Sequence, residues 1–186
     1  MECIKNIVEI ISPILLIVFT LLVWCTYEKL KNIEIKRDQL HINENATIIY
    51  YDLILGFKDL VELRNSSMSE PKSLYFSDDW IKNISALSSV LSPIQLELLY
   101  HLYGKLYTFK NHLDCYQEIL ENPQNNKDTI KLRRYKIEFE DMVNLLFKNF
   151  DATFKENIKE GLKEEYKEII IKLEKNIGLE SKKSLL

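Results

Sequence analysis

The first strong pattern along the chain is an apolar run near its N-terminus, from Ile10 to Tyr27, which contains no charged residue. A run of about 18 residues at 1.5 Å per residue spans roughly 27 Å, close to the thickness of the hydrocarbon core of a bilayer. An amphipathic helix that packs on a protein core would show a polar stripe, and this run has none. The pattern therefore predicts a transmembrane helix over residues 10–27.

Features within the run favour an anchor that is not removed. Ser12 followed by Pro13 is typical of a helix start, and Trp24 lies where interfacial aromatic side chains gather. A cleaved signal or lipoprotein signal is one alternative, but no small-x-small site follows the run and Trp24 precedes Cys25. A buried core helix is the other. The expected anchor side chains are Ile10, Pro13, Leu16, Phe19, Leu22, Trp24 and Tyr27.

The cations that flank the run predict its orientation. Lys5 is alone on the N-terminal side, whereas four cations lie within about 15 residues of the other end, where the positive-inside bias is counted. Residues 1–9 are therefore expected outside the cell, and the juxtamembrane stalk 28–41 and everything after it in the cytoplasm. The cations that set this topology are Lys29, Lys31, Lys36 and Arg37.

Helical periodicity continues beyond the stalk. Apolar residues recur every three or four positions as far as Arg64, which predicts that the first helix runs on into the domain. A short helix is expected to start at Ser77 or Asp78. The first stripe consists of Ile42, Ala46, Ile49, Leu53, Phe57 and Leu60. The short helix has Trp80, Ile81, Ile84, Leu87 and Leu91 on one side.

A capping box predicts the start of a long helix. Ser92 and Gln95 have the required spacing, and Pro93 takes the first helical position, so the helix is expected from Pro93 to about Leu120. Its inward residues are expected to be Leu98, Leu99, Leu102, Leu106, Phe109, Leu113 and Tyr116.

The last apolar stripe predicts one more long helix. It is expected to start near Asp128 or Thr129, to bend at Gly161 and to end at about Ile177. Its apolar stripe is Leu132, Tyr135, Phe139, Met142, Val143, Leu146, Phe150 and Phe154.

Together these elements predict an all-α fold, in which a single N-terminal transmembrane helix continues into a cytoplasmic bundle of four to five helices. No stretch alternates with the period of a strand, and Gly and Pro number only four each, which favours few long elements. The bundle is expected over residues 42–178, followed by a flexible tail over 179–186.

Composition narrows the function classes. The net charge of −3 gives no overall positive field toward nucleic acid. Cys115 is the only cysteine beyond the anchor, which suits a reducing compartment. The sequence lacks a phosphate loop, a nucleophile elbow and a metal quartet, so we expect a protein that is not an enzyme and that has no cofactor and no small-molecule substrate.

A basic segment between Lys127 and Lys136 is the first candidate for binding chemistry. Arg133 and Arg134 are bidentate donors that suit phosphate or an anionic lipid. An ordinary solvated helix turn is the simpler interpretation, because no Gly-rich loop accompanies the cations. The candidate anion contacts are Lys131, Arg133, Arg134 and Lys136.

Three further patterns have both a functional and an ordinary interpretation. His112 and Cys115 have the spacing of helical metal ligands, but lack further ligands nearby. Tyr100, Tyr103 and Tyr107 form a stripe that suits base stacking or core packing. Residues 155–170 repeat Lys-Glu-x-apolar, which is typical of a solvated helix or of a surface for a partner helix.

These observations lead to one functional hypothesis and one alternative. The hypothesis is a membrane-anchored cytoplasmic helical interaction or scaffold module whose partners are membrane lipid and either another protein or a second copy. The alternative is a small phage-related or defence-type membrane effector that acts by oligomerising in the bilayer. Against the alternative, the span has no Gly-x-x-x-Gly motif.

Overall fold

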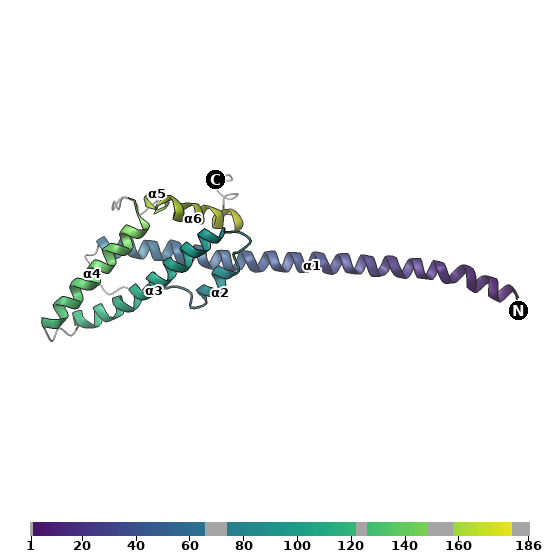
Figure 1. The fold of residues 1–186 in the computed structure, drawn as a ribbon, viewed down its shortest axis with the longest axis horizontal. Coiled ribbons are helices and arrows are strands. Elements are labelled where there is room, and N and C mark those ends of the chain that lie inside the picture. The colour runs from purple at the N-terminus through teal and green to yellow at the C-terminus, as the bar shows by residue number, and fades with distance from the viewer. Residues whose placement is uncertain (1, 66–73, 122–125, 149–157, 180–186) are drawn as a thin grey trace. The chain divides into compact units, whose positions relative to one another are not determined.

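The computed structural model describes residues 2–65, 74–121, 126–148 and 158–179, and it describes no side chains for 2–13, 64–65, 120–121 and 126–129. Over the described residues the protein is all-helical, with 85% helix and no strand, which confirms the predicted fold class at that level. The helices are α1 (Glu2–Asn65), α2 (Trp80–Ser85), α3 (Pro93–Glu121), α4 (Asn126–Leu146), α5 (Ile158–Gly161) and α6 (Glu164–Asn176) (Figure 1).

The chain divides into two compact units, Met1–His41 and Ile42–Leu186. The first unit is the N-terminal part of α1, and its side chains from Ile14 onward are exposed. Among the residues that the structure describes, no helix combines the length and the apolar character that a membrane crossing requires. The transmembrane prediction for 10–27 gains no support from this result, and its first four residues lie among those without described side chains.

The hydrophobic core lies in the second unit and begins with the C-terminal part of α1. Five of the six residues of the predicted stripe are buried, and Ile42 at its start is half-buried against the core. Spacing of three and four residues places them on one side of the helix, so a single face supplies the contacts. The buried five are Ala46, Ile49, Leu53, Phe57 and Leu60, none more than 1% exposed.

α2 is shorter than its apolar pattern suggests. Asp79 is its N-cap residue, in place of the expected Ser77 or Asp78, and it makes no side-chain capping bond. The helix ends at Ser85, while Leu87 and Leu91 are buried beyond it in turns. Ile81, expected on the inner side, is 59% exposed. Burial of the later leucines therefore does not depend on a continuing helix.

α3 starts as its capping box predicts. The Ser92 N–H donates to Gln95 Oε1 at 3.1 Å, and the Gln95 N–H donates to Ser92 Oγ at 3.4 Å. Of the inward residues expected along this helix, Leu98 and Tyr116 are only half-buried, whereas the others are buried. Tyr103 is fully buried although it was not among them.

The prediction of one long C-terminal helix is wrong, because the structure has three separate helices in this part of the chain. α4 ends at Leu146, and α5 and α6 are separated at Leu162 and Lys163. The physical reason is a pair of antiparallel backbone bonds around Phe147 and Leu162: the Lys148 N–H donates to the Gly161 carbonyl, and the Lys163 N–H to the Leu146 carbonyl, both at 2.9 Å. Phe150 and Phe154 of the predicted stripe lie outside the described residues.

α6 ends close to the predicted point, at Asn176, and Gly178 adopts a left-handed backbone with φ 73°. That conformation suits glycine, which has no Cβ. The Leu179 N–H then donates to the Glu174 carbonyl at 3.0 Å, in the manner of a helix-terminating motif.

Polar contacts attach α6 to α1 and α5. Lys159 Nζ donates to both carboxylate oxygens of Glu174, at 2.7 and 2.9 Å, and the Tyr50 hydroxyl donates to the same carboxylate at 2.9 Å. Glu174 is only 8% exposed, so its charge is compensated inside the domain. Burial and this carboxylate raise the pKa of Tyr50 to about 12.

Candidate functional site

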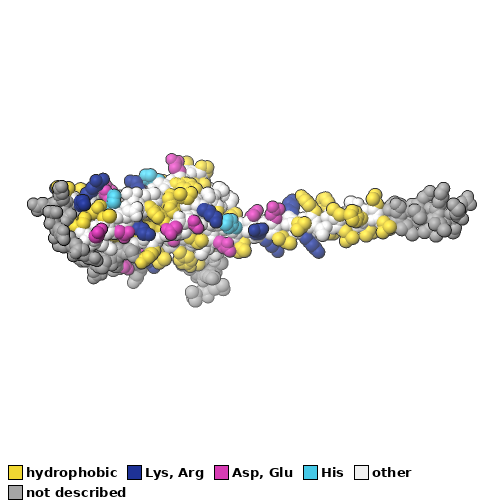
Figure 2. Space-filling model, turned by 90° about the horizontal axis from the view of Figure 1, so that it is seen from below, with side chains coloured by type: hydrophobic (Ala, Val, Ile, Leu, Met, Phe, Trp, Pro, Cys, Tyr) yellow, Lys and Arg dark blue, Asp and Glu magenta, His cyan; other side chains and the backbone are white. Residues whose placement is uncertain are grey.

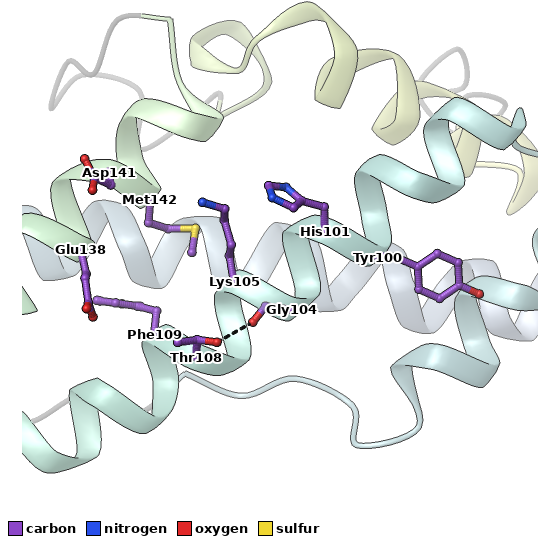
Figure 3. Close-up of a pocket in the computed structure, with 9 residues that line it drawn as sticks. All are labelled: Tyr100, His101, Gly104, Lys105, Thr108, Phe109, Glu138, Asp141 and Met142. Carbon is purple, nitrogen blue, oxygen red and sulfur yellow. Dashed lines mark hydrogen bonds between the residues drawn. The ribbon is translucent and has the colours of Figure 1, made fainter.

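A groove of about 430 Å³ lies between α3 and α4. This volume falls in the range of small-molecule sites, which is roughly 300–1,000 Å³. Figure 3 shows its lining, with His101 and Lys105 extending from α3 into the space beside Met142 of α4. The residues that line it are Tyr100, His101, Gly104, Lys105, Thr108, Phe109, Glu138, Asp141 and Met142.

The groove is open because α3 carries a glycine on this face. A Cβ built on Gly104 would meet no atom within 4 Å, so the missing side chain leaves real space. The Thr108 hydroxyl donates to the Gly104 carbonyl at 3.0 Å and so remains close to its own helix. The helix continues through both residues, and the opening therefore costs no backbone hydrogen bond.

The inner part of the groove is apolar. Phe109 and Met142 are 3% and 4% exposed, and Phe109 packs on Phe139 with ring centroids 5.5 Å apart. Phe109 and Met142 each belong to an apolar stripe that the sequence predicts to face inward. The same residues that join α3 to α4 therefore form the apolar lining.

Charged side chains of opposite sign line the two helices. α3 contributes Lys105 and His101, one helical turn apart, while α4 contributes Glu138 and Asp141 at i,i+3 spacing. Glu138 is already bound: Arg134 Nε donates to it at 3.1 Å, and His112 Nδ1 contacts its other oxygen. Within the described residues, neither Lys105 nor Asp141 forms an ion pair.

The tyrosine stripe of α3 serves packing and loop attachment. Trp80 stacks on Tyr103 with ring centroids 5.4 Å apart and 14° between the planes. The Tyr107 hydroxyl donates to the Ser77 carbonyl at 2.9 Å and to Asp78 at 3.2 Å. Burial, helped by the hydrogen bond to Asp78 and by its charge, raises the pKa of Tyr107 to about 12. The core-packing interpretation of this stripe accounts for Tyr103 and Tyr107.

A half-buried carboxylate lies beside these rings. The Ser77 N–H donates to Asp52 Oδ2 at 2.9 Å, and the Tyr103 hydroxyl is 3.5 Å from the same oxygen. Burial raises the pKa of Asp52, although both bonds act to lower it. Burial also raises the pKa of Tyr103 well above its ordinary value, with Asp52 adding to the effect. This cluster attaches the segment before α2 to α1 and α3.

The candidate anion contacts Lys131, Arg133, Arg134 and Lys136 all lie on α4 with exposed side chains. Arg134 is bound to Glu138, one turn further along. The role of these four cations as anion contacts stays a prediction. The topology cations Lys29, Lys31, Lys36 and Arg37 are likewise exposed, on α1.

His112 and Cys115, which have the spacing of helical metal ligands, do not gather with further ligands in the described part of the chain. His112 contacts Glu138 and lies 5.3 Å, centroid to centroid, from Tyr135, while Cys115 is exposed. In the described ranges no three His, Cys, Asp or Glu side chains are placed to hold a metal ion together.

The Lys-Glu repeat packs inside the domain on its apolar side. Ile158, Leu162, Tyr166 and Ile170 are all buried. Its stripe is therefore core, and it does not offer a surface for a partner helix. Within the repeat, Glu164 and Lys167 form an i,i+3 pair at 4.0 Å, and Glu156 lies outside the described residues.

No family model, no curated protein and no solved structure matches the chain. Sequence reasoning missed the groove, although Gly104 in a helix that is otherwise free of glycine was a signal that could have located it.

Proposed function

We propose that the protein is a membrane-anchored helical interaction module, with residues 10–27 in the bilayer and a cytoplasmic domain that binds another protein. The observation that carries the proposal is the exposure of the apolar run. Figure 2 shows hydrophobic side chains along the exposed part of α1. Leu16, Phe19, Leu22, Trp24 and Tyr27 are each between 62% and 70% exposed.

Apolar side chains that are exposed on all sides of a helix are unfavourable in water, so they are expected to contact lipid or another protein. Large exposed apolar surfaces mark membrane or protein contacts, and a helix that is apolar all round suits a lipid environment better than a one-sided protein groove. The second unit holds the whole described core and does not use this run. The flanking cations support the cytoplasmic placement.

The domain supports an interaction role rather than catalysis. Its buried polar groups are bound within the fold, as in the contacts of Glu174 and of the segment before α2. We therefore propose that the protein is not an enzyme.

The test is membrane extraction of the full-length chain. Wild-type protein should remain with membranes through an alkaline carbonate wash, whereas Leu16→Asp with Phe19→Asp should release it, because each acidic side chain costs about 3 kcal/mol at the bilayer centre. Ile94→Asp is the matched control, since Ile94 is 71% exposed on α3 and outside the run. Release of the wild-type chain by the wash would overturn the anchor.

A second measurement addresses the orientation and the partner. A reporter that is active only in the cytoplasm, fused to the C-terminus, should be active. Cross-linking in the native membrane should then capture a defined protein through the domain. A depolarised membrane on expression, with no captured protein, would instead favour the oligomerising effector.

A further inference from the structure

We propose that the groove between α3 and α4 binds a short zwitterionic organic ligand. Its anionic end lies toward Lys105 and His101, its ammonium end toward Asp141 and Glu138, and a short apolar body between them lies on Phe109 and Met142. This inference stands on the groove and does not depend on the membrane anchor.

The charges are the first argument. Lys105 and Asp141 face the same cavity from different helices, are exposed, and make no ion pair in the part of the chain that the structure describes. Opposite charges on neighbouring helices pair where they come within reach, as Lys159 of α5 and Glu174 of α6 do. Across the groove, the charged groups of Lys105 and Asp141 remain more than 4.0 Å apart, which is the limit for an ion pair. A ligand that carries both signs can contact each of them at once.

The apolar lining is the second argument. Phe109 and Met142 are already 3% and 4% exposed and form the apolar floor of the groove. An apolar ligand body that lies against this floor removes its own apolar surface from water, which contributes about 25 cal/mol per Å². Few polar groups around an apolar surface is the usual composition of a small-molecule site.

The third argument is that the Glu138 carboxylate is held in position. Glu138 is held by Arg134 and His112 from two sides, so its direction is fixed before a ligand arrives. Asp141, one turn along, has no such partner and remains available to an ammonium group. A carboxylate that makes no ion pair among the described residues, beside one whose direction is fixed, suits the ammonium end of the ligand.

The experiment uses the full-length chain, in lipid nanodiscs if it requires a membrane and otherwise in buffer. Binding is measured by ligand-observed saturation-transfer NMR with three ω-amino acids of increasing length: aminobutyrate, aminohexanoate and aminooctanoate. Hexanoate and hexylamine, each with one charged end, are the ligand controls. At least one ω-amino acid should bind saturably and about ten-fold more tightly than both controls, since a charge-assisted hydrogen bond contributes at least that much.

Two charge variants locate the ends of the ligand. Lys105→Gln and Asp141→Asn should each weaken binding about ten-fold. The matched controls are Lys110→Gln and Asp114→Asn, on α3 but outside the groove, and they should leave binding unchanged. Gly104→Leu should abolish binding by filling the space without removing a charge, and it keeps the test valid if a charge variant folds poorly.

Three results would overturn the proposal. The first is no saturable binding of any ω-amino acid. The second is equal binding of hexanoate or hexylamine, which would leave an apolar cavity without charge selection. The third is unchanged binding in Gly104→Leu, which would place the ligand elsewhere on the protein.

Discussion

Lys159 donates to both carboxylate oxygens of Glu174, at 2.7 and 2.9 Å, and joins α5 to α6 through a pair that is largely shielded from water. The side chains are 25% and 11% exposed. Tyr50 of α1 donates to the same carboxylate, so three helices meet at one charge. The pair therefore holds the C-terminal helices on the N-terminal one.

Removal of one member of this pair should destabilise the fold. Lys159→Met leaves the Glu174 carboxylate with Tyr50 alone, and we expect a loss of about 2 kcal/mol, between the values for exposed and for fully buried pairs. The measurement is urea unfolding of the full-length chain, followed by circular dichroism. Glu165→Gln, at an exposed position of α6, the helix that carries Glu174, should change stability by less than about 0.5 kcal/mol. An equal effect of both variants would contradict the role given to the pair.

Gly56 of α1 and Gly104 of α3 should respond in opposite directions to alanine. A Cβ on Gly56 would stand 2.5 Å from the buried ring of Phe76, so Gly56→Ala should destabilise by about 1–3 kcal/mol. Gly104 has open space, and Gly104→Ala should stabilise by about 0.5–1 kcal/mol through helix propensity. Thermal unfolding of the two variants side by side measures both signs. Stabilisation by Gly56→Ala would mean that Phe76 moves aside freely.

The raised pKa of Asp52 predicts a pH dependence of stability. A carboxyl with a higher pKa in the folded state favours folding when it is protonated. Its contribution is therefore complete below the ordinary value, about 3.9, and is lost as the pH rises through the folded value. Asp52→Asn stays neutral and should gain stability relative to the wild type as the pH rises through that window. Urea unfolding across the acid range tests this, and a difference that does not vary with pH would contradict it.

The capping box of α3 should contribute measurably to stability. Ser92→Ala removes the oxygen that accepts from the Gln95 N–H, and loss of such a cap costs about 1 kcal/mol. Ser92→Asp retains an acceptor and should preserve most of the stability. The free energies of unfolding of the three proteins give the comparison. If both variants were equally destabilised, a cause other than the lost acceptor would be required.

Local signals predicted those parts of the fold whose causes are local. The apolar stripe of α1 and the capping box at Ser92 depend on residues three or four positions apart, so the sequence pattern contains them directly. The break before α6 depends on backbone bonds between residues near Phe147 and near Leu162, which are distant in sequence. A helical period that continues on both sides gives no indication of such a bridge.

The sequence contains a signal for one wall of the candidate site, Gly104, but not for the pairing of its two helices. Lys105 and Asp141 belong to separate helices, and only their packing brings them to one cavity. The residues that the pattern did single out, such as Arg133 and Tyr103, stand out by type or by spacing along one helix. Their roles in the fold follow from burial: Arg133 is exposed, and Tyr103 is part of the core.

The backbone bridge between Phe147 and Leu162 also has a consequence for variation in chain length. Only backbone groups take part in its two bonds, so the bridge does not depend on which side chains these positions carry. The entropy of closing a chain between two contacting residues grows slowly, by roughly 0.6 kcal/mol for each doubling of the length. Doubling the number of residues that separate Lys148 from Gly161 in the sequence should therefore weaken the bridge by only about that amount.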